Sequence, residues 1–348
     1  MVTATGQYIV RSRFARTGLI CAAEVAERIG RLAAPYLVME PGAAEPGEWR
    51  VVAHGRPSPA AVPESGTAAG EVPVRYAVDH RAKVLYHVAP RDQAWVVQSV
   101  LRAIRAVHRS AASRQGALFL HAGVVELNGI GVALSGASRA GKTSFIMASV
   151  LAGAGKMVCN DDVSLLAEDG GVVGVGWPRS ISARLDTLDL LFGRDRAERI
   201  RASLSHPGNR TLASLQESGV EPHGTALLYP WEYADAMRTT IGCSARVEAV
   251  VHLSLADDPS EVDLSPVPPG ASRALLDARV LAEPNKHLNI FGHEPAAASL
   301  SRTRDALAEL PSFRLRYDFR DVRGHVDDLG DFLSARLGLC ALGMPAPG

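Results

Sequence analysis

Apolar residues recur at every third or fourth position between Gln93 and Ala112, and this is the strongest helical pattern in the chain. The spacing predicts a helix there, because side chains three and four residues apart share one face of a helix. Three arginines fall on the opposite side, which could bind an acidic partner but which we expect to face water: Arg102, Arg105 and Arg109. The apolar run Ala117–Leu120 then predicts a strand that ends at His121.

Shorter patterns occupy residues 1–92. One helix is predicted between Ala22 and Leu32, and the Pro-, Ala- and Gly-rich stretch from Arg56 to Pro73 predicts loops. Short apolar or alternating runs predict strands at Gln7–Val10, Tyr36–Val38, Trp49–Val52, Val74–Val78 and Lys83–Val88. We expect a small α+β domain over residues 1–92, either a structural cap or a module that recruits a partner.

A strand–loop–helix–strand pattern forms the centre of the chain. An apolar strand at Val132–Leu134 leads to a glycine-rich loop, and the apolar run Ser144–Leu151 predicts a helix. Lys156–Cys159 predicts a strand, which we expect to lie parallel beside the first strand. The later predicted elements are a hairpin or edge strand at Gly170–Gly176, strands at Val247–Leu255 and Phe313–Phe319, and helices at Leu185–Phe192, Gly270–Ala282 and Val326–Leu337.

These elements predict an α/β domain over residues 93–340, followed by a disordered tail over residues 341–348. The polar segment from Arg194 to Gly224 is interpreted as a lid or a peptide-binding loop. Arg179 and Arg184 are candidates for contact with a phosphate. The segment that holds Lys286 and His287 is expected to begin a surface helix.

The glycine-rich loop fits the pattern G-x-x-x-x-G-K-[ST] and has the flanking strand and helix that this pattern requires. Its residues are Gly136, Ala137, Ser138, Arg139, Ala140, Gly141, Lys142 and Thr143, and Ser144 follows. In such a loop the backbone N–H groups surround phosphate, the lysine reaches the β- and γ-phosphates, and the threonine hydroxyl binds Mg²⁺. The alternative is a glycine-rich turn with an incidental lysine. The flanking elements favour an ATP site.

Asp161 and Asp162 directly follow the strand predicted at Lys156–Cys159. Two carboxylates at the end of a strand can divide the work of phosphoryl transfer, one binding Mg²⁺ and the other accepting a proton from the attacking hydroxyl. The alternative is a solvated turn, since Asn and Asp favour turns. The neighbouring glycine-rich loop favours the functional interpretation.

The stretches Leu120–Val125 and Gly129–Val132, the loop, and Asn160–Val163 together resemble the C-terminal domain of the HPr serine kinase/phosphorylase family. They are most similar to the HPr-kinase-related branch associated with peptide natural products, including lasso peptides. The family has a histidine fifteen residues ahead of the first loop glycine, and His121 and Gly136 keep that interval. The resemblance covers roughly residues 116–166 and implies a P-loop kinase domain of the HPr-kinase and PEP-carboxykinase type, with a mixed sheet.

The resemblance also implies roles for individual residues. Asp161 would be the base that activates a serine hydroxyl, and Asp162 and Thr143 would help to hold Mg²⁺. His121 would lie near the transferred phosphate; the alternative is a strand histidine whose side chain is satisfied by a backbone group. The bacterial HPr kinases are hexamers, so the resemblance makes a homo-oligomer one expectation for this chain.

Two features depart from the family. The segment Gly174–Arg179 contains no acidic residue where the bifunctional enzymes carry a glutamate metal ligand. The C-terminal signature of those enzymes is also not matched. The resemblance therefore does not extend to phosphorylase activity or to HPr as the substrate.

Composition excludes several classes of protein. The chain has 348 residues and a formal net charge of zero, so no general positive charge favours nucleic acid. No apolar run reaches the roughly 20 residues that span a bilayer, and we expect no membrane association. The four cysteines, Cys21, Cys159, Cys243 and Cys340, are far apart and are expected to be thiols in a cytoplasmic protein.

We therefore expect an enzyme that transfers the γ-phosphoryl group of ATP to a hydroxyl with the help of Mg²⁺. The acceptor is expected to be a serine in a peptide or small protein, such as a natural-product precursor peptide. One alternative is a kinase of a small-molecule alcohol. The other is a non-catalytic sensor or scaffold that binds ATP, and the missing acid downstream favours it.

Overall fold

A computed structural model describes residues 5–65, 72–90, 92–209, 224–281, 285, 288, 290–291 and 297–338. The chain divides into two compact units, each built from segments that are not continuous in sequence. The first unit comprises Met1–Phe119, Trp177–Ala236 and Leu281–Thr303, and the second comprises Leu120–Gly176, Met237–Val280 and Arg304–Gly348. An independent domain over residues 1–92 stays a prediction, and the expected tail and Lys286 and His287 lie outside the described residues.

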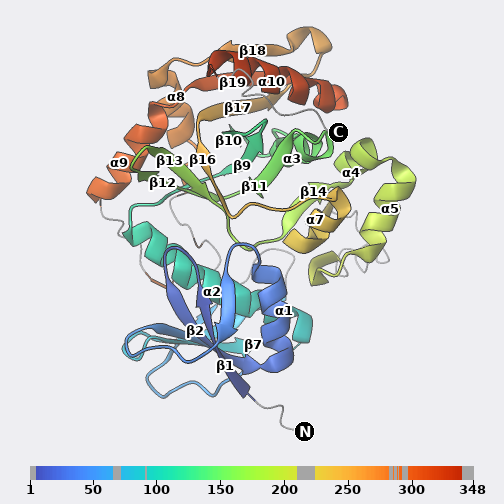
Figure 1. The fold of residues 1–348 in the computed structure, drawn as a ribbon. Coiled ribbons are helices and arrows are strands. Elements are labelled where there is room, and N and C mark those ends of the chain that lie inside the picture. The colour runs from blue at the N-terminus through green and yellow to red at the C-terminus, as the bar shows by residue number, and fades with distance from the viewer. Residues whose placement is uncertain are drawn as a thin grey trace, which may run out of the picture. The chain divides into compact units, whose positions relative to one another are not determined.

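The first unit contains a mixed sheet of seven strands in the order β3-β1-β2-β4-β7-β6-β5 (Figure 1). Its central neighbours β2, β4 and β7 run parallel, and the outer pairs are antiparallel. The strands are β1 (Thr5–Arg11), β2 (Arg16–Ala22), β3 (Val38–Pro41), β4 (Trp49–Ala53), β5 (Val62–Ser65), β6 (Arg75–Asp79) and β7 (Val84–Ala89). The predicted strands are thus found with shifted ends, and β2 and β5 were not predicted.

Helices α1 (Ala23–Ala33) and α2 (Gln93–Arg114) pack on this sheet and on each other. Asp92 caps α2, because its carboxylate accepts hydrogen bonds from the N–H groups of Ala94 and Trp95. Apolar side chains from the sheet and from both helices form one core. The first unit also holds the two-stranded sheet of β14 (Ile181–Arg184) and β15 (Thr225–Leu228), with helices α4 (Leu185–Phe192), α5 (Arg194–Ser203) and α7 (Pro230–Met237) near them in the chain.

Two expectations for this unit are wrong. Arg109 of α2 is buried rather than solvated, because its guanidinium lies over the ring of Phe119, 4.7 Å from the ring centre, and near Trp177. Burial is tolerated because the flat guanidinium can stack on aromatic rings. The segment expected to be a loop from Arg194 begins instead with helix α5, and residues 210–223 lie outside the described part.

The second unit is built on a six-stranded mixed sheet in the order β11-β9-β10-β17-β19-β18 (Figure 1). Its central strands β10, β17 and β19 run parallel, and β9 and β18 flank them antiparallel. These strands are β9 (Ala122–Leu127), β10 (Ile130–Gly136), β11 (Gly155–Cys159), β17 (Ala249–Leu255), β18 (Asp263–Pro266) and β19 (Ser312–Tyr317). The expectation of a mixed α/β architecture is confirmed.

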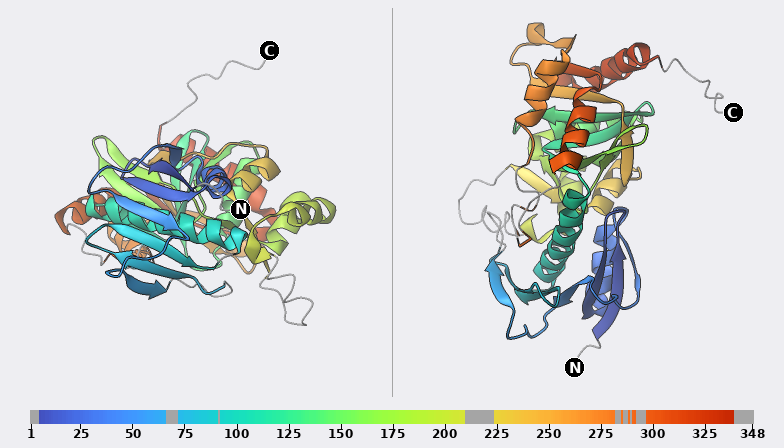
Figure 2. Two further views of the ribbon diagram at one scale, coloured as in Figure 1. Left: turned by 90° about the horizontal axis from the view of Figure 1, so that it is seen from below. Right: turned by 90° about the vertical axis from the view of Figure 1, so that its left-hand side faces the viewer.

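A second sheet has the order β16-β13-β12-β8, with β8 (Leu118–Leu120), β12 (Val163–Glu168), β13 (Gly171–Val175) and β16 (Ser244–Val247). The prediction of a hairpin or edge strand at Gly170–Gly176 is wrong: the segment forms one strand, β13, which pairs with β12 on one side and with β16 on the other. The helices include α3 (Lys142–Leu151), α8 (Pro269–Asp277) and α10 (Val322–Arg336), and α9 (Ala297–Ala308) spans the boundary between the units. Helix α10, drawn in red in Figure 2, packs on α3. The described residues also form the short 3₁₀ helices η1 (Pro259–Glu261) and η2 (Phe319–Asp321).

The expected neighbour of β10 is wrong. Strand β11 runs in the same direction as β10 but does not lie beside it, because β9 lies between them and pairs antiparallel with both. The cause is a tight hairpin between β9 and β10. Asn128 and Gly129 at its tip have φ values of +51° and +82°, as a two-residue turn of this hand requires. An Asn-Gly pair between apolar runs is the sequence signal for this turn.

The helices of the described residues include none that is long and apolar enough to cross a membrane.

A substitution in β10 tests the packing of the second unit. A Cβ atom at Gly131 would overlap the backbone carbonyl of Arg246, whereas Gly270 at the start of α8 has nothing within 4 Å of that position. We expect Gly131→Ala to lower the free energy of unfolding by about 1–3 kcal/mol, because backbone has to move to remove the overlap. Gly270→Ala is the control and should be neutral or stabilising, by up to about 1 kcal/mol. Urea denaturation measures both, and equal stability of the two variants would contradict the packing described.

Candidate active site

The glycine-rich loop connects β10 to α3 in the second unit, as the pattern predicts. Gly136 ends β10 and Lys142 begins α3. Gly141 precedes the helix with φ +82°, and Arg139 also has a positive φ, +67°. The side chains of Ala137, Ser138 and Arg139 are exposed, and Ala140 is buried. The loop therefore places the N–H groups of the first turn of α3 at its open side, where an anion can bind.

Tyr317 of β19 contacts the last glycine of the loop. Its hydroxyl donates a hydrogen bond to the carbonyl of Gly141 at 3.1 Å, and its ring packs edge-on against Phe145 of α3. Tyr317 is fully buried, and burial raises the pKa of its hydroxyl. A side chain at position 141 would overlap this hydroxyl, so the glycine is required by the tyrosine as well as by its backbone conformation. This contact joins positions 176 residues apart and could not be read from the loop pattern.

Lys142 lies almost completely inside the second unit, with 8% of its surface exposed. Its ammonium donates hydrogen bonds to the carbonyls of Gly136 and Ala137, at 3.1 and 3.3 Å. Its Nζ also lies 3.2 Å from Nε2 of His121. The loop thus curls around its own lysine, and the ammonium stays at the open end of β10.

His121 links this lysine to both aspartates. It lies in the bend between β8 and β9, where its backbone N–H donates to the carbonyl of Arg279. Its Nδ1 is 2.8 Å from Oδ1 of Asp161 and 3.5 Å from Oδ1 of Asp162. The expected alternative, a side chain satisfied by a backbone group, does not describe this histidine. The structure therefore brings His121, Lys142, Asp161 and Asp162 into one cluster, which we call the loop cluster.

The two aspartates differ in exposure. The side chain of Asp161 is 24% exposed, whereas that of Asp162 is 5% exposed. Asp162 also has a positive φ, +51°, a conformation that aspartate adopts more readily than most residues. The bend between β11 and β12 therefore directs one carboxylate toward solvent and buries the other, which suits them to different tasks.

The charges of the loop cluster shift its proton equilibria. Hydrogen bonds to Asp161 and then Asp162 raise the pKa of His121 to about 9, against the opposing effects of burial and of the positive charge of Lys142. Burial lowers the pKa of Lys142, the aspartates oppose this, and the charge of Arg279 adds to it. The pKa values of histidine and lysine thus move toward each other. At 3.2 Å the two nitrogens share a hydrogen bond only when one of them lacks a proton; when both are charged, the loop carbonyls and the aspartates offset their repulsion.

The loop cluster also offers metal ligands. One ligand atom from each of His121, Asp161 and Asp162 lies within 4.8 Å of the others. Thr143 is partly exposed in the first turn of α3, and Ser144 next to it is buried. Carboxylate and hydroxyl oxygens are the ligands that Mg²⁺ prefers. The chemistry of Asp162 and Thr143 therefore fits Mg²⁺, and that of His121 fits it less well.

Two residues near the loop cluster were not found from the sequence. Arg279 follows α8, anchors His121 through its carbonyl, and places its positive charge close enough to affect Lys142. Tyr317 ends a strand that was predicted, but the alternation of that strand shows only that the tyrosine is buried. Arg179 and Arg184, which were considered as phosphate ligands, belong to the first unit, where Arg184 forms an ion pair with Asp186 at 2.7 Å.

The likeness of this chain to known proteins is weak. No protein-family model matches the chain, and no curated protein matches it. Among solved structures, the Hpr(Ser) kinase/phosphatase from Coxiella burnetii is similar at 13% sequence identity and a TM-score of 0.30, over 64% of this chain and 99% of that one. A likeness at this level assigns neither a family nor an activity. The functional assignment therefore depends on the side chains of the loop cluster.

The raised pKa of His121 can be measured directly. We expect its imidazole to titrate near pH 9 by NMR, rather than near the ordinary value of about 6.5. Asp161→Asn should lower this midpoint, because it removes the largest cause of the shift. Folding stability should be highest below about pH 6.5 and fall as the pH rises through 9, since the folded state binds the proton more tightly than the unfolded chain. His121→Gln should remove this part of the pH dependence; an unchanged profile would contradict the assignment.

Proposed function

We propose that the chain is a phosphotransferase that moves the γ-phosphoryl group of ATP to a hydroxyl. The observation that carries the proposal is the loop cluster: a buried lysine and two aspartates gathered by one histidine at the N-terminus of a helix that follows a glycine-rich loop. This arrangement combines a phosphate-binding loop, a base and oxygen ligands for a metal within a few ångströms. Those are the parts that phosphoryl transfer requires.

The loop supplies the binding of the nucleotide. The N–H groups of Gly141, Lys142 and Thr143 would donate hydrogen bonds to phosphate oxygens at the positive end of α3. Lys142 would exchange its contacts with the carbonyls of Gly136 and Ala137 for the β- and γ-phosphates. Burial destabilises the ammonium of Lys142 and so lowers its pKa. Negative charge on the phosphates would offset this cost, which favours the exchange.

Mg²⁺ would be held by Asp162 and Thr143, whose oxygen atoms suit it. When bound, the ion would offset negative charge on the phosphates. Burial of the Asp162 carboxylate prepares it for this role, since a buried carboxylate is stabilised by a cation. His121 would then remain a partner of Asp161 and of the transferred group rather than a metal ligand.

Asp161 would act as the base. The oxygen of the acceptor hydroxyl attacks the γ-phosphorus, the bond from that phosphorus to the bridging oxygen of ADP breaks, and the hydroxyl proton passes to the Asp161 carboxylate. The exposed position of this carboxylate lets an acceptor approach it. His121 holds one of its oxygens at 2.8 Å and thereby fixes its direction.

The acceptor is proposed to be a serine of a peptide or small protein. Its support is the sequence resemblance to the HPr-kinase-related branch, which the residues of the loop cluster carry. A small-molecule alcohol is the second candidate acceptor. The alternative that is not an enzyme is a sensor or scaffold that binds ATP without transferring its phosphoryl group.

Substitution of the base tests the proposal. Asp161→Asn should lower the rate of phosphoryl transfer by at least about a hundredfold, because amide nitrogen and oxygen cannot accept the proton. Its affinity for ATP should stay within a few-fold of the original. Intact-mass spectrometry of the acceptor, with ATP and Mg²⁺ present, measures the transfer, and calorimetry measures the affinity. Asp331→Asn, an exposed aspartate on α10, is the matched control and should change neither.

The outcomes separate the candidates. Transfer to a peptide that disappears in both Lys142→Ala and Asp161→Asn supports the peptide kinase. Transfer only to a metabolite supports the second acceptor. ATP binding without any transfer supports the sensor, and near-normal transfer by Asp161→Asn would overturn the choice of base.

The metal ligands can be tested separately. Asp162→Asn preserves shape and tolerates the positive φ of this position, but it removes the negative charge. We expect the Mg²⁺ concentration for half-maximal transfer to rise at least about tenfold, because the site loses one anionic ligand. Thr143→Ala should act in the same direction. A transfer rate that depends on Mg²⁺ as in the original protein would contradict the assignment of both residues.

A further inference from the structure

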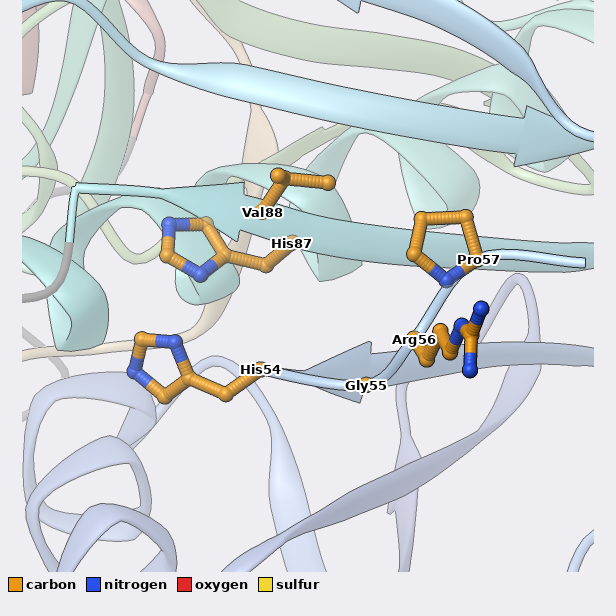
Figure 3. Close-up of a pocket in the computed structure, with 6 residues that line it drawn as sticks. All are labelled: His54, Gly55, Arg56, Pro57, His87 and Val88. Atoms are coloured by element: carbon orange, nitrogen blue, oxygen red, sulfur yellow. The ribbon is translucent and has the colours of Figure 1, made fainter.

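A pocket of about 640 Å³ lies in the first unit, outside the loop cluster. Its lining residues are His54, Gly55, Arg56, Pro57, His87 and Val88 (Figure 3). His54 directly follows β4, and His87 lies near the end of β7, its parallel neighbour. The pocket thus opens at the carboxyl ends of two adjacent parallel strands, an edge at which α/β proteins often bind ligands.

The two histidine rings lie next to each other in this pocket, edge to face. Their centres are 5.3 Å apart and their planes meet at 76°. Each ring turns one nitrogen toward the other, while Arg56 and Pro57 lie at the opposite end of the pocket (Figure 3). His54 has a positive φ of +58°, and its N–H donates to the carbonyl of His87 at 3.1 Å. The backbone therefore holds a histidine in an uncommon conformation just where its side chain meets the second one.

The protonation of His87 follows from its surroundings. It is completely buried, and burial, with a smaller contribution from His54, lowers its pKa to about 4 against the opposing effect of the Ala89 carbonyl. Its Nε2 lies 2.7 Å from Oγ of Ser99 on α2. That hydroxyl donates its hydrogen to the carbonyl of Trp95 at 2.6 Å, so it accepts from Nε2–H.

A neutral imidazole with a hydrogen on Nε2 carries a lone pair on Nδ1. Within the described part of the chain, this buried Nδ1 has no partner in hydrogen-bonding geometry; the backbone of Ala89 affects the pKa of the ring without making such a bond to Nδ1. A buried nitrogen of this kind usually has a partner, either a hydrogen-bond donor or a bound ligand, since an unsatisfied buried polar atom is costly. The arrangement is also that of a metal-binding histidine, in which the far nitrogen donates to an oxygen and the near nitrogen presents its lone pair.

We propose that His54 and His87 bind a divalent transition metal ion of the zinc class in this pocket. Imidazole nitrogens suit such ions, whereas Mg²⁺ prefers oxygen. With a metal–nitrogen distance of about 2.0–2.1 Å and tetrahedral angles, two imidazole centres lie about 5.2 Å apart. The observed 5.3 Å agrees with this spacing. Two protein ligands leave the other positions of the ion open to water or to a small ligand in the pocket.

Zinc titration of the full chain by calorimetry tests the site. His54→Asn keeps a residue that tolerates the positive φ at an exposed position, so the fold should be retained. We expect it to weaken zinc binding at least about tenfold, since one of two imidazole ligands is removed. The matched control is His80→Asn, an exposed histidine between β6 and β7 at the other end of β7, which should bind zinc as the original does.

A second variant separates this site from the loop cluster, which can also bind metal. Asp162→Asn should leave the zinc affinity of the histidine pocket unchanged. NMR of the original protein should show the imidazole signals of His54 and His87 shifting on addition of one equivalent of zinc. Zinc binding that is lost in Asp162→Asn but kept in His54→Asn, or absence of binding at millimolar zinc, would overturn the proposal. Neither result would bear on the proposed phosphoryl transfer, which the mass measurement tests independently.

Discussion

The buried ammonium of Lys142 is the constraint on which the second unit depends. A charged group with so little exposure is stable only where carbonyls and opposite charges surround it. Here the carbonyls belong to the loop itself, and the opposite charges are those of Asp161 and Asp162. His121 lies between the lysine and these carboxylates. Strand β10, the bend after β8 and the bend between β11 and β12 must therefore meet at one point.

The topology of the sheet makes that meeting possible. The hairpin at Asn128 and Gly129 places β9 between β10 and β11, so His121, just before β9, lies beside the end of β10. The same arrangement brings Asp161, just after β11, within 2.8 Å of the histidine. Tyr317 adds support from the far side by binding the carbonyl of Gly141. Strand pairing thus brings residues from four parts of the chain together.

The two units use histidines in opposite ways. In the loop cluster, carboxylates raise the pKa of His121, so the ring tends to carry a charge at neutral pH. In the pocket of the first unit, burial lowers the pKa of His87, so the ring stays neutral and keeps a lone pair. A charged imidazole suits a site that handles anions, and a neutral imidazole suits a site that binds a soft or borderline cation. This difference supports separate roles for the two sites.

The position of the glycine-rich loop, between a strand and a helix, was determined by the sequence alone. Gly136, Gly141, Lys142 and Thr143 are close in the chain, so their spacing specifies the loop between a strand and a helix, and the structure has that loop. The mixed α/β class and most of the long elements also followed from periodicity. What only the tertiary structure decided is which distant residues meet: β9 rather than β11 beside β10, Arg109 buried between rings, and Tyr317 and Arg279 at the loop cluster. Such contacts depend on strand order and on packing between segments far apart in sequence, which local patterns do not encode. The contact between His54 and His87 is also decided by tertiary structure, because it requires β4 and β7 to pair.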